Sequence, residues 1–173
     1  MNFTLRPWHI SDLNSLVNCA NNFNIAKNMT NQFEHPYTIE KGEHFIRNVS
    51  QQNPLHVFAI DINGHAVGGI GIHPQHDIQC KNAELGYWLA EAYWGNGIIS
   101  KAIPQMLTYG FKTFDIDRIF ARPFGTNIAS QKVLEKTGFT LEAHLKNTLF
   151  KNGEFVDELI YGIRRNEFVN DFT

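Results

Sequence analysis

The segment Trp94-Gly95-Asn96-Gly97-Ile98-Ile99-Ser100-Lys101 places two glycines between a strand-like and a helix-like stretch. A helix start presents unpaired N–H groups and the positive end of its dipole, so it is a ready anion site. Glycines let a phosphate approach the backbone. Ser100 replaces the third glycine of a dinucleotide fingerprint and the Walker spacing is absent, which disfavours hydride transfer and nucleotide hydrolysis. On this motif alone, a tight turn without a ligand is the alternative.

A metal site is the second chemistry that residue types suggest. His73 and His76, with Cys80 nearby, could ligate a metal, but no carboxylate stands at ligand spacing. We expect a solvated loop here and no metal. Cys19 and Cys80 cannot form a disulfide framework, and we expect two reduced thiols.

Apolar periodicity predicts the elements that would position these residues. Alternation predicts strands over 3–6, 55–62, 66–72, 83–90, 118–124, 139–150 and 155–164. Helical spacing predicts helices over 11–22, 38–49, 99–114 and 126–137. Ser11 would cap the first helix and Thr38 would start the second, Gly138 would end the last, and Asn63-Gly64 would turn a hairpin. The order predicts an α/β (α+β mixed) fold with a mixed sheet of about seven strands and about four helices on its two faces.

Composition fits one globular domain over residues 1–173. Apolar residues make up 43% of the chain and charged residues 18%. The formal net charge is −2 and the basic residues form no long run, so a nucleic-acid-binding face is disfavoured. The apolar runs are far shorter than a membrane span, and the N-terminus lacks the pattern of a signal peptide. We expect a soluble, cytoplasmic protein with no nucleic-acid or membrane partner.

Several motifs in order resemble the GNAT superfamily of N-acetyltransferases. After the Gly-rich turn, that superfamily has a strand and then a helix with characteristic ends. The corresponding segments here are Asn127-Ile128-Ala129-Ser130 at the start of the helix and Lys136-Thr137-Gly138-Phe139 at its end. Leu5-Arg6-Pro7-Trp8, Ala83-Glu84-Leu85-Gly86-Tyr87-Trp88-Leu89 and Tyr93-Trp94-Gly95-Asn96-Gly97 are similar to the branch of ribosomal-protein N-terminal (alanine or serine) acetyltransferases. The resemblance covers nearly the whole chain and implies the GNAT fold.

The resemblance implies acetyl-coenzyme A (acetyl-CoA) as co-substrate. In the family, the strand matching 83–90 is splayed from the strand matching 118–124, and the pantetheine arm lies in that gap. The backbone groups that pair with it would belong here to Tyr87 and Leu89. A backbone N–H near Leu89 would also stabilise the oxyanion of the thioester. The pyrophosphate would lie on the N–H groups of Asn96 to Lys101.

Two positions depart from the family pattern. The last small residue of the Gly-rich motif is Ile99 here, which is bulkier and would weaken the phosphate contact. Pro104 falls inside the predicted helix and frees the carbonyl of Ser100, because proline has no N–H to donate. We therefore expect a kink or a late helix start.

The resemblance also implies a general base. An ammonium loses a proton before it attacks a thioester, and a carboxylate in apolar surroundings can take that proton, because burial raises the pKa of a carboxyl group. Glu84, in an apolar strand near the expected acetyl site, is the candidate. Alternatively, Glu84 anchors a loop or binds a cationic substrate without taking its proton.

A second set of residues could assist the departure of the thiolate. Many family members carry a tyrosine acid where Leu134 stands. Ser130, one turn from Asn127 on the same helical face, could hydrogen-bond the sulfur or its water, while Asn127 could hold the pantetheine. The alternative is that Asn127 caps the helix and Ser130 is an ordinary helical residue.

These features predict an N-acetyltransferase that transfers an acetyl group from acetyl-CoA to a primary amine by direct attack in a ternary complex. Phe33 and Tyr37 are expected to wall the acceptor pocket, unless both rings belong to the core. The acceptor would be a protein N-terminus or a small-molecule amine; 17 unclustered acidic residues weigh against a polyamine. The rival is a non-catalytic acyl-CoA-binding module. Such a module would tolerate any residue at positions 84 and 130. We expect a monomer or a homodimer.

Overall fold

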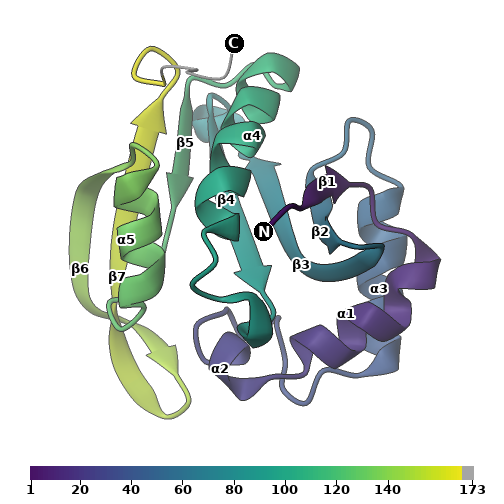
Figure 1. Ribbon diagram of the computed structural model, residues 1–173. Helices are drawn as coiled ribbons and strands as arrows, with labels where there is room; N and C mark the ends of the chain where they lie inside the picture. The colour runs from purple at the N-terminus through teal and green to yellow at the C-terminus, as the bar shows by residue number, and fades with distance from the viewer. Residues whose placement is uncertain (169–173) are drawn as a thin grey trace. The chain divides into compact units, whose positions relative to one another are not determined.

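The computed structural model describes residues 1–168, which form a mixed seven-stranded sheet and its helices (Figure 1). The strands are β1 (Thr4–Arg6), β2 (Val57–Ile62), β3 (His65–Pro74), β4 (Asn82–Leu89), β5 (Arg118–Ala121), β6 (Thr140–Lys151) and β7 (Glu154–Arg164). The α-helices are α1 (Leu13–Ala20), α2 (Phe23–Ala26), α3 (Ile39–Ser50), α4 (Ile98–Thr113) and α5 (Ile128–Lys136). The strand order is β1-β2-β3-β4-β5-β7-β6, with β4 and β5 parallel. The predicted α/β fold with a mixed sheet is confirmed.

The chain forms two compact units. The first comprises Met1–Gly71 with Tyr87–Ile99, and the second comprises Ile72–Gly86 with the described chain from Ser100 onward. In the first unit, α1 and α3 pack together, and a Cβ atom on Gly42 of α3 would lie only 2.7 Å from Leu13 of α1. The core beneath these helices includes Trp8, Leu16, Ala20, Ile46, Val57, Ala59 and Ala66. The first unit is thus stabilised by apolar burial between two helices and β1–β3.

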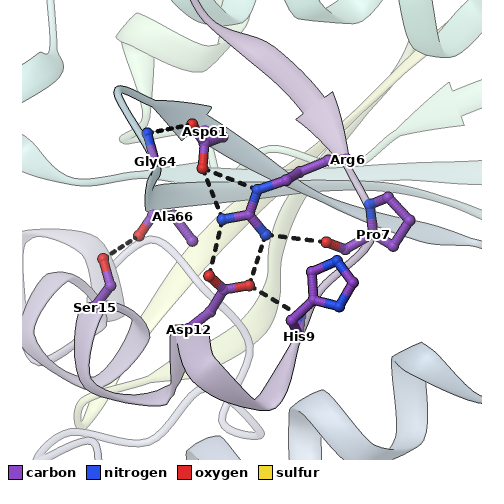
Figure 2. A network of polar contacts seen from close by, with 8 residues as sticks. All are labelled: Arg6, Pro7, His9, Asp12, Ser15, Asp61, Gly64 and Ala66. Atoms are coloured by element: carbon purple, nitrogen blue, oxygen red, sulfur yellow. Dashed lines mark hydrogen bonds and ion pairs between the residues drawn. The ribbon is translucent and has the colours of Figure 1, made fainter.

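A polar network also joins elements of the first unit (Figure 2). The Arg6 guanidinium donates to both carboxylate oxygens of Asp12 at 2.7 and 2.8 Å, and to Asp61 Oδ2 at 2.9 and 2.7 Å. Asp12 accepts a further bond from the His9 N–H at 2.9 Å, and Asp61 accepts one from Gly64 N–H at 2.8 Å. The network therefore ties β1 to the start of the first helical segment and to the β2–β3 turn.

In the second unit, the first half of β4 pairs with β5, β5 pairs with β7, and β7 returns along β6. The register of β4 with β5 ends at Glu84 and Phe120, although β4 continues to Leu89. The β6–β7 hairpin turns at Asn152 and Gly153, whose φ angles are 52° and 87°. Such left-handed pairs are typical of two-residue hairpin turns.

Three local predictions are wrong. Ser11 does not cap a helix; it lies inside a 3-10 turn, Ile10–Asp12, because the Asp12 carboxylate binds the His9 N–H and starts helical turns earlier. The segment that follows the predicted helix 11–22 was not predicted to be helical, but it contains the one-turn helix α2, capped by the Asn22 side chain, whose oxygen lies 2.7 Å from the Asn24 nitrogen. Of the kink or late helix start expected around Pro104, the late start is wrong, because α4 begins at Ile98 and runs through Pro104.

Two predicted helix ends, one at the start of α3 and one after α5, are confirmed. Thr38 Oγ1 accepts the Lys41 N–H at 3.3 Å and begins α3 as predicted. Gly138 follows α5 with φ +91°, a conformation that glycine adopts at low cost. Around Pro104, the buried side chains Ala102, Ile103, Met106 and Leu107 hold α4 in the second unit's core, which explains why one missing hydrogen bond does not end the helix.

Candidate active site

The Gly-rich turn leads directly into α4. Gly95 and Gly97 have φ angles of +76° and +70°, which other residues adopt only with strain. The Trp94 indole N–H donates to the Leu89 carbonyl at 2.7 Å, and Asn96 Nδ2 donates to the Tyr93 carbonyl at 3.1 Å. A Cβ atom at Gly95 would meet no heavy atom within 4 Å, so the backbone there is open. The turn is held in shape by its own side chains and leaves its glycine backbone accessible.

The first turn of α4 carries the other predicted phosphate residues. Ile98 is buried, Ile99 and Ser100 are half-buried, and Lys101 is exposed. Ile98, Ile99 and Ser100 form the first turn of a 16-residue helix, at the end where backbone N–H groups and the positive end of the helix dipole point outward. Ile98 anchors the turn in the core while the following residues stay near the surface.

The predicted acceptor residues belong to an aromatic group in the first unit. The Phe33 ring lies 5.2 Å from the ring of Tyr37 and 5.8 Å from that of Trp88, measured between centroids. Tyr37 is only 8% exposed, and its burial raises the pKa of its hydroxyl. Tyr37 therefore packs in the core, whereas Phe33 is half-buried and is the ring that a ligand could reach. Tyr87, next to Trp88 on β4, is also half-buried.

Glu84 in the second unit is held by Arg122, which follows β5. Arg122 Nε and Nη2 donate to Glu84 Oε1 and Oε2, each at 3.0 Å, in a bidentate pair. Arg122 Nη1 also lies 3.5 Å from Oε1 of Glu158 on β7. The hydrogen bond to Glu84 is the main cause that raises the pKa of Arg122, against the opposing effect of burial. The candidate base is thus one of two carboxylates that share a single guanidinium.

A second arginine–carboxylate pair begins at Arg118, the first residue of β5. Arg118 donates to Glu142 of β6, with Nε 3.1 Å from each carboxylate oxygen, and to Asn82 Oδ1 at 3.0 Å. The guanidinium carbons of Arg118 and Arg122 lie 4.8 and 6.0 Å from the centroid of the Phe120 ring. Residues 118, 120 and 122 therefore share one face of the strand, as the period of two requires.

Arg122 and Glu158 were not among the site residues predicted from the sequence. The alternation Arg118-Ile119-Phe120-Ala121-Arg122 carries a signal, because it places two cations on one face. Their partners depend on the pairing of β5 with β4 and β7, which residue spacing along the chain does not give.

Asn127 and Ser130 come together at the start of α5. The Asn127 side chain accepts the Ser130 N–H at 3.2 Å, so Asn127 is the N-cap that the alternative predicted. Both residues are half-buried. Leu134, at the position of the family's tyrosine, is fully buried and packs in the core. The hydroxyl of Tyr161 donates to Glu135 at 2.9 Å; burial, then Glu135, raises its pKa to about 12.

Two of the residues considered for a metal site, His76 and Cys80, flank a short turn. His76 precedes the 3-10 turn Asp77–Gln79, and Cys80 follows it and is exposed. Within residues 1–168, no three His, Cys, Asp or Glu side chains are grouped so that they could hold a metal ion. In the same part of the chain, no helix has the length and apolar character needed to span a bilayer.

The site thus combines a mixed sheet, in which the parallel register of β4 with β5 ends at Glu84 and Phe120, with a Gly-x-Gly turn that leads from β4 into α4. The chain belongs to the acetyltransferase (GNAT) domain family, whose model matches residues 2–140. The predicted superfamily is confirmed.

Individual relatives support this placement. An uncharacterized N-acetyltransferase, YoaA of Bacillus subtilis, is 35% identical over 97 residues, covering 56% of this chain and 54% of the relative. The ribosomal-protein-serine acetyltransferase of Escherichia coli is 35% identical over 81 residues, covering 47% and 45%. The chain thus spans about half the length of these curated relatives.

A solved structure matches over a longer range. The spermidine N-acetyltransferase from Vibrio cholerae, in complex with CoA and spermine, has a TM-score of 0.80 and 25% identity, covering 95% of this chain and 96% of that chain. The relatives therefore include one enzyme named for a ribosomal protein and one named for a polyamine.

Proposed function

We propose that the protein transfers an acetyl group from acetyl-CoA to a primary amine, by direct attack in a ternary complex. The observation that carries the proposal is the family match over residues 2–140, which includes the exposed Gly95–Gly97 turn before α4. Acetyl-CoA supplies the activated acyl carbon and a thiolate leaving group. The N–H groups of Asn96 to Lys101 would hold its pyrophosphate, since a helix start favours anions.

Glu84 is the proposed proton acceptor. A proton passes from the acceptor's ammonium to a Glu84 carboxylate oxygen, and the freed lone pair attacks the thioester carbonyl carbon. A backbone N–H near Leu89 would stabilise the developing oxyanion. The C–S bond then breaks with its electron pair on sulfur, and the second proton of the attacking nitrogen goes to the thiolate through water, with Ser130 positioned by Asn127 to assist. The acceptor is a protein N-terminus or a small amine.

A non-catalytic acyl-CoA-binding module is the second candidate. It would explain the Gly-rich turn equally well. The presence of Glu84, Asn127 and Ser130 together favours the enzyme, because a module would tolerate any residue at positions 84 and 130.

The experiment has two stages. Acetyl-CoA at about 100 times its dissociation constant should stabilise the fold by roughly 2.7 kcal/mol, which raises the melting temperature by several degrees. An acceptor screen of peptides, amino acids and polyamines, following thiol release, then identifies the amine. A melting shift with ATP or NAD but none with acetyl-CoA would overturn the proposal. A shift without thiol release on any acceptor would support the binding module.

The Gly97→Val variant tests the phosphate site itself. A side chain at Gly97 would occupy the space proposed for the pyrophosphate and should abolish the shift with acetyl-CoA. Gly64→Val is the matched control, because Gly64 also has a positive φ, +83°, and lies in the β2–β3 turn. Both variants should lose stability through backbone strain of about 1–3 kcal/mol, and only Gly97→Val should lose cofactor binding.

A further inference from the structure

Arg122 is shared between two carboxylates that come from different strands. Its Nε and Nη2 bind Glu84 on β4, and its Nη1 lies 3.5 Å from Glu158 on β7. The segment that carries Arg122 is fixed to β7 on the other side, since Leu159 N–H donates to the Pro123 carbonyl at 3.1 Å. The position of the guanidinium is therefore set by the backbone of the second unit.

We propose that Arg122 and Glu158 are positioning residues that act through Glu84, Arg122 by orienting its carboxylate and Glu158 by keeping that carboxylate able to accept a proton. The proposal rests on the proposed function, in which Glu84 is the general base. Neither Arg122 nor Glu158 needs to touch the substrate.

The physical reason is competition for one cation. A bidentate arginine paired with a single carboxylate stabilises the charged form and makes that carboxylate a poor base. A second carboxylate bound to the same guanidinium weakens the electrostatic stabilisation that the first carboxylate receives from it. When Glu84 is protonated, Arg122 keeps Glu158 as its partner, so no unpaired cation is left behind.

Other charged groups face this cluster. Arg118, with its partner Glu142, lies on the same face of β5 and next to the Phe120 ring. His73 of β3 also faces this side, since its Nε2 would lie 3.8 Å from a Cβ atom at Gly86. The Arg118–Glu142 pair is a natural control, because it is a similar arginine–glutamate pair that does not involve Glu84 or Arg122.

Two variants should move the pH dependence in opposite directions. In Glu158→Gln, Glu84 becomes the single carboxylate of this cluster that Arg122 binds. The acidic limb of the pH–rate profile should therefore shift to lower pH by roughly one unit, and maximal turnover should fall about tenfold. Arg122→Gln leaves two carboxylates without their cation, so the limb should shift to higher pH by a similar amount. Arg122→Lys should restore only part of the orientation, because an ammonium cannot bind bidentately. KM for acetyl-CoA should change little in all three variants.

The same test has a readout that does not need turnover. A carbon-13 NMR titration of the Glu84 side-chain carboxyl should show its midpoint move down in Glu158→Gln and up in Arg122→Gln. Glu142→Gln should leave both the midpoint and the pH–rate profile unchanged. The inference is overturned if the Glu84 midpoint is the same in the parent and both variants, or if Glu142→Gln moves it as far as Glu158→Gln.

The failure of the proposed function looks different. If the parent shows no thiol release but the Glu84 midpoint moves as expected, the coupling among the three residues stands and the catalytic assignment fails. If Glu84→Gln keeps full turnover, Glu84 is not the base and the positioning role is overturned with it.

Discussion

Each of the two compact units holds one arginine between two carboxylates, but the surroundings differ. Around Arg6, the carboxylates of Asp12 and Asp61 also accept backbone N–H groups, and these residues are 6% and 8% exposed (Figure 2). Around Arg122, the side chains of Glu84 and Glu158 are 28% and 13% exposed and that of the arginine 46%. The same ion-pair chemistry is thus enclosed in one unit and solvent-accessible in the other.

The difference indicates which network stabilises the fold. A buried charge that loses its partner keeps its desolvation cost, whereas an exposed one regains water. The Asp12–Asp61 network is therefore expected to contribute more to stability, whereas the more exposed Glu84–Glu158 network could exchange partners at lower cost in the proposed reaction.

The largest effect is expected from Glu84→Gln. The change keeps the shape of the side chain but removes the proton acceptor, so turnover should fall by ~10²–10⁴. The loss should shrink as pH rises, because the amine then deprotonates unaided. A pH–rate profile on a confirmed acceptor checks this, with Glu142→Gln as control. If turnover is retained and the acidic limb is unchanged, Glu84 is a structural anchor.

Arg6→Gln should have the next largest effect, on stability rather than on turnover. The variant leaves two buried carboxylates without their cation, which costs about 3–5 kcal/mol of unfolding free energy. Arg122→Gln should cost less than about 1 kcal/mol, because its partners are more exposed. Urea denaturation of both variants measures the difference. Equal losses would remove the distinction between the two networks.

Acid should destabilise the first unit through Asp12. Burial raises the pKa of Asp12, but hydrogen bonds from Arg6 and His9 outweigh it and hold the pKa below its ordinary value. A carboxyl group with a lowered folded-state pKa stabilises the fold above its unfolded pKa of ~3.9, and this contribution is lost as pH falls through the folded value.

Unfolding free energies measured from pH 7 down to pH 3 test the Asp12 prediction. The parent should lose stability below about pH 4 more steeply than Asp12→Asn, which has no such group to protonate. Parallel curves for the two proteins would show that other carboxyl groups account for the acid sensitivity.

Ser130→Ala should have the smallest effect. A coenzyme A thiolate leaves tolerably well without a donor, since thiol pKa values lie near ~8.5. The N–H that Asn127 caps is kept, so stability should hardly change. We expect a turnover loss of less than about tenfold in a single-turnover assay. A larger loss than that of Glu84→Gln would reverse the importance of the two residues.

Much of the fold could be predicted because its signals are local. Alternation gave the strands, Asn63-Gly64 turned the hairpin with φ angles of 53° and 83°, and Gly138 ended α5. The helix α2 was missed because one turn is too short to show a helical period. The Ser11 cap was predicted wrongly because the Asp12 carboxylate binds Arg6 and the His9 N–H, so that a 3-10 turn begins at Ile10, before Ser11.

The candidate site was predictable only in its individual residues. Glu84, Gly97 and Asn127 could be named from motifs, since each stands in a recognisable local sequence. The roles of Arg122 and Glu158 follow from which strands are neighbours: Arg122 is 38 residues from Glu84 in sequence, and only the order β4-β5-β7 brings the three side chains together. Long-range pairing is set by the packing of the whole unit.

The division of the chain also has a consequence for biosynthesis. The chain passes from one unit to the other after Gly71, after Gly86 and after Ile99, so each unit is built from two separated segments. During synthesis on the ribosome, the first unit is incomplete until Tyr87–Ile99 has been made, and this segment follows Ile72–Gly86 of the second unit. The segment Ile72–Gly86 must then wait for β5 to emerge before β4 gains its parallel neighbour. No single proteolytic cut yields both units intact, and a nascent chain of about 100 residues would leave a half-paired strand for chaperones to protect.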